Sequence, residues 1–511
     1  MQAIILAGGK GTRLASRLNG LPKPLIDVCG EPLLARQVRM LERAGINDVI
    51  VLVNHRADAI QAFFKGWVGA RVTLVDDGTP KGTAGAALAA LDRLSEQFFV
   101  VYGDTLFDID LKHMLAAHNS AGADATLFLH PNDHPQDSDL VEIGRDGWII
   151  SFHPYPHPGG VDFRNLVNAA FYVCNRPALE PWQDFPGTPD FAKDLFPAML
   201  RSGARLRGYV STEYIKDLGT PARLDKVERH LREGRVERAS RRRPQAAVFI
   251  DRDGTLNVLR GYVCSPDEME LLPGADNGVR RLNDAGLKAV LVTNQPVLAR
   301  GDCDWPMMYR IHARLDMLLG ACGAYLDDIR VCPHHPDSGF EGECSELKIV
   351  CACRKPAPGM IVDACRDWNL DPLASWVVGD STADIGAAAA TGLTSILVLT
   401  GEGGRDGKHE VQPDFITRDF EAAAEFIVKA ISRLEARILT ALSTVAIDAP
   451  VSIESAFIGP ARAARAALRR MGREAVNISL PVDGPSEGVV LVVDGVRQAV
   501  AMEDLGLEWS F

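Results

Sequence analysis

Two short segments of this 511-residue sequence each place phosphate-binding or reactive residue types directly after an apolar run. The first, IILAGGKGTRL at residues 4–14, joins three glycines to two cations. The second, FIDRDGTL at residues 249–256, sets two aspartates two positions apart. Glycine turns offer backbone N–H groups to phosphate, and carboxylates at strand ends offer oxygen to a metal ion or a phosphorus atom. Both segments therefore predict phosphate chemistry.

The glycine segment matches neither of two common phosphate-binding loops. Leu14 replaces the third glycine of the dinucleotide-binding pattern G-x-G-x-x-G, and no G-K-[ST] follows that would make a P-loop. Arg13 follows the glycines at once, and Lys23 lies a little further on in LPKPL. A glycine turn with ordinary surface cations would have the same local sequence. The longer pattern is needed to distinguish such a turn from a phosphate-binding loop.

That longer pattern resembles the sugar-nucleotide pyrophosphorylases, a family of nucleotidyltransferases. Five motifs stand in the family's order, namely Leu6–Leu14, Pro22–Leu25, Gly82–Ala86, Gly103–Asp104 and Asp217–Pro221. In this family a sugar 1-phosphate attacks the α-phosphate of a nucleoside triphosphate, and pyrophosphate leaves. Because both reactants are anions, cations and N–H donors must offset their repulsion.

The resemblance implies a role for each matching residue. Arg13 would hold the leaving phosphates and Lys23 the α-phosphate, while Asp104 and Asp217 would hold Mg²⁺, an ion that prefers oxygen ligands. An aspartate after a strand can instead cap a helix or a turn, which is the alternative for these two. The substrate-binding residues implied are Gly8, Gly9, Gly11, Thr12, Gly82, Gly85 and Lys193.

One family motif is missing from the first segment. Many members carry V-x-x-F-x-E-K-P, whose lysine reaches the sugar phosphate, whereas this chain has IISFHPYPHP at residues 149–158. His153 and His157 are possible replacements, or they pack within the loop, and Lys193 in DFAKDLFP remains available. An alternative follows, in which the first segment only binds a nucleotide or sugar phosphate, or regulates, and does not transfer.

The aspartate segment resembles the D-x-D-G-T signature of haloacid-dehalogenase-type (HAD) phosphatases, and a capped turn is the alternative. The resemblance extends through LVTNQ (291–295), CRKPAPGM (353–360) and VVGDSTADI (377–385). Phosphate monoesters hydrolyse so slowly in water that a covalent route and a metal ion are expected. Asp251 would attack phosphorus, and Asp253 would protonate the leaving oxygen and then activate water.

The same resemblance implies the remaining residues of the phosphatase site. Mg²⁺ would be held by Asp251, the backbone carbonyl of Asp253, and Asp380, with Asp384 as a supporting carboxylate. The transferring phosphoryl group would be bound by Thr293, Asn294 and Lys355.

Six of the ten cysteines crowd between residues 322 and 365, and four residues there have metal-ligand spacing. Cys332 and His334 form C-x-H, and Cys351 and Cys353 form C-x-C, with sixteen residues between the two pairs. Three thiolates and one imidazole suit a tetrahedral structural Zn²⁺ site. His335 and Cys344 are alternative ligands, and cysteines gathered by chance in a buried sheet region would need no metal.

The spacing CPHHP…CACRKP resembles the zinc loop of the D-glycero-D-manno-heptose 1,7-bisphosphate 7-phosphatases, and less closely that of histidinol-phosphate phosphatases. In that resemblance the loop orders Arg354 and Lys355 against the substrate phosphate. The stretch TNQPVLARG departs from the family, which usually has Ser-Gly after the glutamine, so reaction class is better defined than substrate.

Strand-like and helix-like runs alternate through both segments and must position these residues. AIILAG, LLARQVRMLERAGI and DVIVLVN begin one series, and AAVFID, NGVRRLNDAGL and KAVLVTN begin another. We expect an α/β protein with two Rossmann-like three-layer domains, of the nucleotide-diphospho-sugar transferase fold and the HAD fold, plus a small α/β C-terminal module.

Composition shifts along the chain predict the domain boundaries. A basic run ending in proline, HLREGRVERASRRRPQ at 230–245, is interpreted as a solvated helix end and linker, and a glycine-rich stretch at 400–414 as a second boundary. The predicted domains are a transferase at 1–235, a linker at 236–245, a phosphatase with a zinc loop at 246–415, and a module at 420–511.

Residues 440–496 read as strand, loop, helix, strand and strand, with the first strand at 444–450 and the loop at 451–459. This order resembles the start of uridine-kinase-like P-loop kinases. The P-loop DGPSGSGKST would stand at DAPVSIESAF, where Glu454 and Ser455 occupy the positions of a glycine and the lysine. A carboxylate repels a triphosphate, so the sequence predicts no ATP binding here. We expect a degenerate module for packing or oligomerisation, and a coincidental βαβ pattern is the alternative.

Composition narrows the partners. A net charge of −12 argues against a nucleic-acid binder, and no apolar run approaches the roughly 18 residues of a membrane span. No signal-peptide pattern opens the sequence, so we expect a cytoplasmic protein, with Mg²⁺ in both active sites, structural Zn²⁺ and possible homo-oligomers.

The two resemblances describe consecutive steps on one metabolite. Removing the 7-phosphate of a heptose 1,7-bisphosphate yields heptose 1-phosphate, which a pyrophosphorylase would activate. The favoured product is GDP-D-glycero-α-D-manno-heptose made from GTP, because the guanylyltransferase of that route is of this type. The ADP-heptose route would use the β anomer and, usually, a differently folded transferase.

Overall fold

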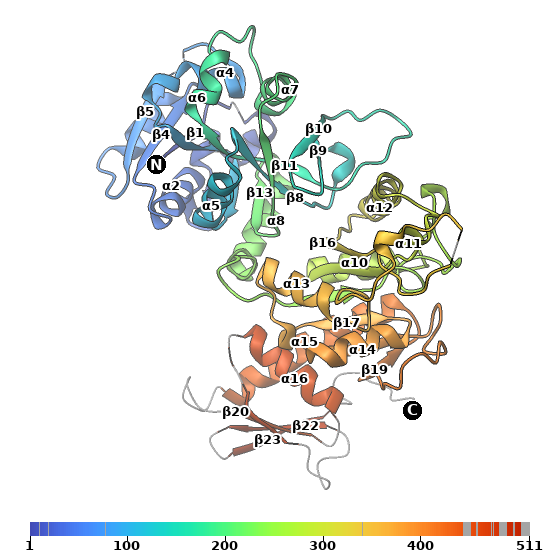
Figure 1. The fold of residues 1–511 in the computed structure, drawn as a ribbon. Coiled ribbons are helices and arrows are strands. Elements are labelled where there is room, and N and C mark those ends of the chain that lie inside the picture. The colour runs from blue at the N-terminus through green and yellow to red at the C-terminus, as the bar shows by residue number, and fades with distance from the viewer. Residues whose placement is uncertain are drawn as a thin grey trace. The chain divides into compact units, whose positions relative to one another are not determined.

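The computed structural model describes all residues except 10, 19, 77, 340, 443–450, 456–457, 472, 474, 480–487, 494–495 and 502–511. The chain divides into two compact units, residues 1–161 with 165–243, and residues 162–164 with 244–511. Both are built from α-helices and sheets that contain parallel and antiparallel strands (Figure 1), so the expected α/β class is confirmed. Among the described helices, none is long and apolar enough to span a membrane.

The first unit is organised around a nine-stranded sheet. Its main order is β10-β9-β11-β6-β1-β4-β5, and β8 joins β12 to β11. The strands are β1 Gln2–Leu6, β2 Asp27–Val28, β3 Glu31–Pro32, β4 Asp48–Val53, β5 Arg71–Asp76, β6 Gln97–Tyr102, β7 Thr105–Asp108, β8 Ala125–His130, β9 Leu140–Ile143, β10 Ile149–His153, β11 Val167–Asn175, β12 Leu206–Val210 and β13 Tyr214–Asp217. The helices are α1 Ala15–Leu18, α2 Leu33–Arg43, α3 Ala57–Phe64, α4 Gly82–Ala89, α5 Leu111–Ala121, α6 Arg176–Leu179, α7 Phe196–Arg201, α8 Pro221–Arg232 and α9 Arg235–Arg238.

The central strands of this sheet are apolar on both faces because helices cover both. On β6, Phe98 and Val100 belong to one buried cluster, while Phe99 and Val101 belong to another on the opposite face. Successive side chains of a strand point to opposite sides, so the continuous apolar run FFVV fits a strand buried between two helical layers. The β1–β4, β1–β6 and β4–β5 pairs are parallel, which brings their carboxyl ends to one edge.

The second unit contains a six-stranded parallel sheet of order β16-β15-β14-β17-β18-β19 and a four-stranded sheet of order β21-β20-β22-β23. The strands are β14 Ala247–Ile250, β15 Lys288–Asn294, β16 Asp328–Cys332, β17 Trp376–Gly379, β18 Thr394–Val398, β19 Phe415–Thr417, β20 Val451–Ser455, β21 Ala475–Ser479, β22 Gly488–Val493 and β23 Val496–Ala501. The helices are α10 Ala275–Asp284, α11 Val297–Arg300, α12 Trp305–Gly320, α13 Gly359–Trp368, α14 Thr382–Thr391, α15 Phe420–Leu442 and α16 Ile458–Arg470.

The C-terminal elements share a core with the six-stranded parallel sheet. One buried cluster joins Val248 and Trp376 of that sheet to Ile427 of α15, Leu468 of α16 and Leu491 of β22. In Figure 1, α15 and α16 lie between the two sheets. Three arginines of α16 bind residues that precede α15 in the sequence. Arg462 contacts the Asp414 carboxylate at 2.9 Å, and Arg465 donates to the Gly392 carbonyl at 2.7 Å.

The structure corrects the expectation of a loop over 451–459 in its first five residues. Residues Val451–Ser455 form β20, which pairs in parallel with β21 and antiparallel with β22. Val451, Ile453 and Ser455 are buried, and alternating burial is typical of a strand. The kinase-like first strand predicted at 444–450 lies outside the described residues, so the kinase resemblance stays a prediction.

Candidate active sites

A cavity of about 330 Å³ in the first unit collects many of the residues predicted to bind nucleotide. It lies at the carboxyl ends of β1 and β6 and at the start of α4. Its predicted lining residues are Gly8, Gly9, Gly11, Lys23, Gly82 and Asp104. Asn54, Thr83 and Tyr102 also line it, although sequence reasoning did not single them out. Open α/β sheets commonly bind ligands at this edge.

Two of these glycines are required by close approach of the backbone. Gly11 has φ +64°, and a Cβ there would lie 2.9 Å from the Cβ of Lys23. Gly82 has φ +78°, and a Cβ there would overlap the backbone carbonyl of Pro189. Both conformations are costly for other residues, so the glycine pattern shapes the cavity wall.

One predicted metal carboxylate of the first unit, Asp104, lies in the turn before β7, and the other, Asp217, lies on the neighbouring strand β13. Asp217 ends β13, which pairs antiparallel with β7, and the N–H of Leu218 donates to the Asp104 carbonyl at 2.8 Å. The ammonium of Lys23 lies 2.6 Å from the Asp104 carboxylate, and Arg223 lies 2.6 Å from that of Asp217. Two carboxylates with adjacent cations can hold Mg²⁺ beside phosphate.

The other predicted residues of this unit lie around the cavity rather than in its lining. Thr12 and Arg13 form the turn after Gly11, and Arg13 approaches Gly219, next to the Asp217 segment. Gly85 lies in α4. Lys193 is half exposed, with its ammonium 4.0 Å from the Asp139 carboxylate.

Both histidines considered as replacements for the missing lysine are hydrogen-bonded to other residues of the chain. His153 Nε2 lies 2.8 Å from the Ser151 hydroxyl, and His157 Nε2 lies 2.8 Å from the Ser138 carbonyl. Both rings are therefore held by residues of nearby segments.

In the second unit, three carboxylates converge at the ends of β14 and β17. Oxygens of Asp251, Asp380 and Asp384 all lie within 4.8 Å of one another. The buried ammonium of Lys355 bridges Asp251 at 2.5 Å and Asp384 at 2.6 Å, and donates to the Val292 carbonyl at 2.7 Å. The structure thus brings together the predicted nucleophile, metal ligand and phosphate cation.

Burial and the closeness of the negative charges raise the pKa values of two of these carboxyl groups. Burial raises the pKa of Asp251 to about 7, although Lys355 opposes the shift. Burial, with the charges of Asp251 and Asp384, raises the pKa of Asp380 to about 8. A cation binding between these carboxylates would relieve their repulsion, so the donor set fits Mg²⁺.

Asp253 has a different environment from Asp251. Burial by itself would raise the pKa of Asp253, but the buried guanidinium of Arg252, 2.8 Å away, and the amides of Asn257 and Gln295 hold it below the ordinary value. Arg252 stands between the two aspartates in sequence, and its role was not predicted. In the free protein it favours the carboxylate form of Asp253.

The predicted phosphate-binding residues on β15 mainly organise their neighbours. The Thr293 hydroxyl accepts from the amide of Gln295 at 2.8 Å. The Asn294 side chain exchanges two hydrogen bonds with the backbone of Lys355, at 3.0 and 3.1 Å. Asn294 thereby fixes the segment that carries the Lys355 ammonium.

The glycine-rich stretch interpreted as a domain boundary contributes to the carboxylate site of the second unit. The N–H of Glu402 donates to the Asp380 carboxylate at 2.7 Å, and the Thr400 hydroxyl donates to the Gly254 carbonyl at 2.7 Å. A Cβ at Gly401 would overlap the Asp380 carboxylate. Gly-Glu-Gly-Gly at 401–404 could have suggested such a close approach, but composition alone reads as a linker.

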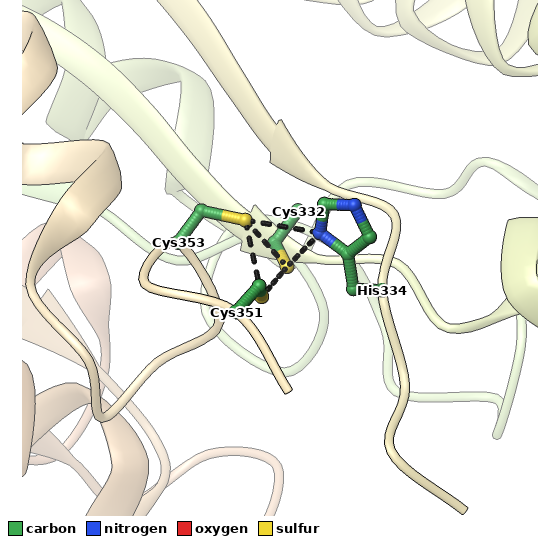
Figure 2. Close-up of side chains that lie close together, drawn as sticks. All are labelled: Cys332, His334, Cys351 and Cys353. Atoms are coloured by element: carbon green, nitrogen blue, oxygen red, sulfur yellow. Dashed lines mark hydrogen bonds between the residues drawn. The ribbon is translucent and has the colours of Figure 1, made fainter. Parts of the chain in front are cut away.

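The predicted zinc ligands form one compact cluster (Figure 2). The Cys353 sulfur lies 3.1 Å from that of Cys332, 3.3 Å from that of Cys351 and 3.2 Å from Nδ1 of His334. Cys332 ends β16, and Cys351 and Cys353 approach it from the following loop. Three thiols and one imidazole nitrogen in contact fit a tetrahedral Zn²⁺ ion.

The alternative ligands His335 and Cys344 are not part of this cluster, within the described residues. Arg354, directly after the last cysteine, donates to the backbone carbonyl of His334 at 3.1 Å. The cluster therefore connects to the arginine and lysine that follow it in sequence.

The two halves of the chain are each similar to known proteins. Residues 2–234 match the nucleotidyl transferase family, and residues 352–423 match the HAD-hydrolase-like family. The D-glycero-beta-D-manno-heptose-1,7-bisphosphate 7-phosphatase of Yersinia pestis is 38% identical over 189 residues, which are 37% of this chain and 92% of that protein.

Two further similarities cover the two halves separately. The D-glycero-D-manno-heptose-1,7-bisphosphate 7-phosphatase of Thermosynechococcus vestitus is 41% identical over 191 residues, 36% of this chain and 96% of that protein. The crystal structure of HddC from Yersinia pseudotuberculosis is 26% identical, covers 45% of this chain and 99% of that chain, and has a TM-score of 0.39.

Proposed function

We propose two consecutive reactions for this chain, which belongs to the D-glycero-D-manno-heptose-1,7-bisphosphate 7-phosphatase family and carries a nucleotidyltransferase domain in its first unit. The second unit removes the 7-phosphate of a heptose 1,7-bisphosphate. The first unit transfers a nucleotidyl group to the resulting heptose 1-phosphate. The carrying observation is that one chain holds both the Asp251–Lys355–Asp380 cluster and the Lys23–Asp104 cavity.

The phosphatase reaction would proceed in two halves. An oxygen of Asp251 attacks phosphorus while the bond from phosphorus to the sugar oxygen breaks, which leaves an aspartyl phosphate. Water then attacks phosphorus and gives one proton to Asp253, while the bond from phosphorus to the Asp251 oxygen breaks, so that inorganic phosphate leaves and the Asp251 carboxylate is restored. Because Arg252 favours the carboxylate form of Asp253, the proton that Asp253 passes to the leaving oxygen would enter with the substrate phosphate.

Metal ions would assist at three places. Mg²⁺ bound by Asp251, the Asp253 carbonyl and Asp380 would neutralise phosphoryl oxygens, and Mg²⁺ at Asp104 and Asp217 would do so for the triphosphate. Zn²⁺ bound by Cys332, His334, Cys351 and Cys353 would hold the loop that ends in Arg354 and Lys355. The domain limits proposed are 1–235, 246–415 and 420–511, with a linker at 236–245.

For the nucleotide we favour GTP, with GDP-D-glycero-α-D-manno-heptose as the product. The support is the pyrophosphorylase type of the first unit, since the route that makes this product uses such a transferase. A coupled assay tests it: GTP or ATP is mixed with α- or β-heptose 1-phosphate, and pyrophosphate is measured. The proposal expects pyrophosphate from GTP and the α anomer.

A second candidate keeps only the phosphatase catalytic, with the first unit binding or sensing nucleotide. It is favoured by Tyr155, which stands where the family lysine would, and by the engaged rings of His153 and His157. Absence of pyrophosphate with all four substrate pairs, in a preparation that still releases phosphate from the bisphosphate, would establish this candidate.

A further inference from the structure

The carboxylate of Asp217 is held asymmetrically. Arg223 Nη1 donates to its Oδ2 at 2.6 Å, and the N–H of Gly219 donates to the same oxygen at 3.2 Å. Both hydrogen bonds that reach this carboxylate from described residues end on Oδ2. Oδ1 is thereby left to face a ligand, in an orientation that Arg223 fixes.

Arg223 is itself oriented by a histidine from a distant segment. Its Nη2 lies 3.1 Å from Nε2 of His134, whose Nδ1 lies 2.8 Å from the carboxylate of Asp133. A guanidinium can only donate and a carboxylate can only accept, so Nε2 must be the acceptor and Nδ1 must carry the proton. The ring is thus in a defined neutral tautomer that points the guanidinium at Asp217.

Asp133 anchors this chain of contacts. Two ammonium groups bind it, Lys216 on β13 at 3.0 Å and Lys226 on α8 at 2.5 Å. Lys226 lies one turn after Arg223 on the same helix, and Lys216 immediately precedes Asp217. The Lys216 contact therefore holds β13, and the Lys226 contact holds α8, to the segment after β8 that carries Asp133 and His134.

We propose that Arg223, held by His134 and Asp133, is a positioning residue that keeps Asp217 oriented to bind the metal ion of the transferase site. The inference rests on the proposed function of that site. Outer partners of a metal-binding carboxylate fix its rotamer, and their loss costs about ten- to a hundredfold in metal affinity or activity. Arg223 touches no substrate in this role.

Substitutions at two links test the proposal in the full chain. Arg223→Lys can still reach Asp217 but cannot also bind His134, whereas Arg232→Lys changes an arginine of the same helix that pairs with Glu228 at the surface. His134→Leu breaks the link, and His134→Gln restores it because an amide both accepts and donates. His113→Gln is the matched histidine control, since His113 bonds Tyr209 instead.

Metal binding is read directly, by the electron paramagnetic resonance signal of free Mn²⁺ titrated with protein and GTP. Arg223→Lys and His134→Leu should weaken one class of Mn²⁺ sites about tenfold or more. His134→Gln and both controls should keep wild-type binding. The Mg²⁺ dependence of phosphate release from heptose 1,7-bisphosphate should not move in any variant.

The outcomes separate three readings. Unchanged Mn²⁺ binding with a raised KM for heptose 1-phosphate would mean that Arg223 binds the sugar phosphate, and would overturn the inference. Unchanged Mn²⁺ binding and unchanged kinetics would overturn it as well. Wild-type protein that forms no pyrophosphate would refute the transferase proposal alone, because the Mn²⁺ titration still reports on Asp217.

Discussion

The two candidate active sites differ in how deeply their carboxylates are buried and in how those carboxylates are paired with cations. In the phosphatase site, Asp251, Asp384 and Lys355 are at most 9% exposed and are locked together before any substrate arrives. In the transferase site, the side chains of Asp104 and Asp217 are 34% and 38% exposed, and each pairs with one cation. One site is buried and crowded, and the other is open and paired.

This difference teaches what each reaction asks of its scaffold. A covalent attack needs a nucleophile fixed within contact distance of phosphorus, so a costly buried cluster is useful. Transfer of a nucleotidyl group between two anionic substrates needs space for both of them. The carboxylates of this site therefore remain accessible, and each lies beside a lysine or arginine side chain. If the comparison holds, changes at one site should leave the other reaction untouched.

The largest expected effect comes from the nucleophile. Asp251→Asn should lower phosphate release from heptose 1,7-bisphosphate by about 10⁴-fold or more, because the amide cannot form the aspartyl phosphate. Pyrophosphate formation from GTP and heptose 1-phosphate should stay at the wild-type rate. Asp363→Asn, at a half-exposed carboxylate of α13 that pairs with Arg366, is the control. Wild-type phosphate release by Asp251→Asn would disprove the assignment.

Lys23→Met should slow the nucleotidyl transfer of the first unit. The ammonium of Lys23 lies in the cavity beside Asp104, and removing a preorganised cation from a transferring phosphoryl group costs about 10²–10³-fold in rate. Initial rates of pyrophosphate and phosphate release are measured on one preparation. Only pyrophosphate release should fall, and Lys65→Met, at the surface, should change neither. Equal loss of both activities would contradict the separation of the sites.

A pair of glycines sharpens the role of the loop over the phosphatase site. Gly401 and Gly407 have similar φ values, +58° and +60°, but a Cβ overlaps Asp380 only at Gly401, with nothing within 4 Å at Gly407. Both alanine substitutions carry the same backbone strain of about 1–3 kcal/mol. Gly401→Ala should therefore release phosphate about tenfold more slowly than Gly407→Ala. Equal rates would show that the loop does not position Asp380.

The smallest effect concerns stability in acid. Burial lowers the pKa of His130 and of His230 to about 3, both in the first unit. Between pH 6.5 and 3 the unfolded chain binds protons that the folded unit excludes, so stability falls as pH falls through this window.

From pH 7 to 5.5 each of these histidines should cost the first unit about 1 kcal/mol in unfolding free energy. Pulse proteolysis in urea, with fragments assigned to each unit by mass, measures it. His230→Asn should reduce the pH slope, and His55→Gln, at an exposed position, should not. A slope unchanged by His230→Asn would refute the assignment.

Sequence reasoning succeeded where chemistry is carried by short motifs. The α/β class followed from alternating apolar runs, and the structure brings together Cys332, His334, Cys351 and Cys353 as their spacing predicted. His335 and Cys344 could not be excluded in advance, because spacing does not tell which side chain points inward.

It failed where function depends on contacts between distant segments. Residues 400–407 have linker composition, yet they cover Asp380 because glycines allow that approach. Arg223 and His134 are 89 positions apart, and no motif marks either one. Val451–Ser455 was expected as a loop because of its likeness to a P-loop position, but pairing with β21 and β22 makes it a strand.

The core that unites α15 and α16 with the phosphatase sheet has a practical consequence for dissecting the protein. A fragment that ends at residue 415 would lack Ile427, Leu468 and Leu491 of the buried cluster and leave Val248 and Trp376 without their apolar cover. Such a fragment would aggregate rather than report on catalysis. The natural place to divide the chain for expression is near residue 243, where its two compact units meet in sequence.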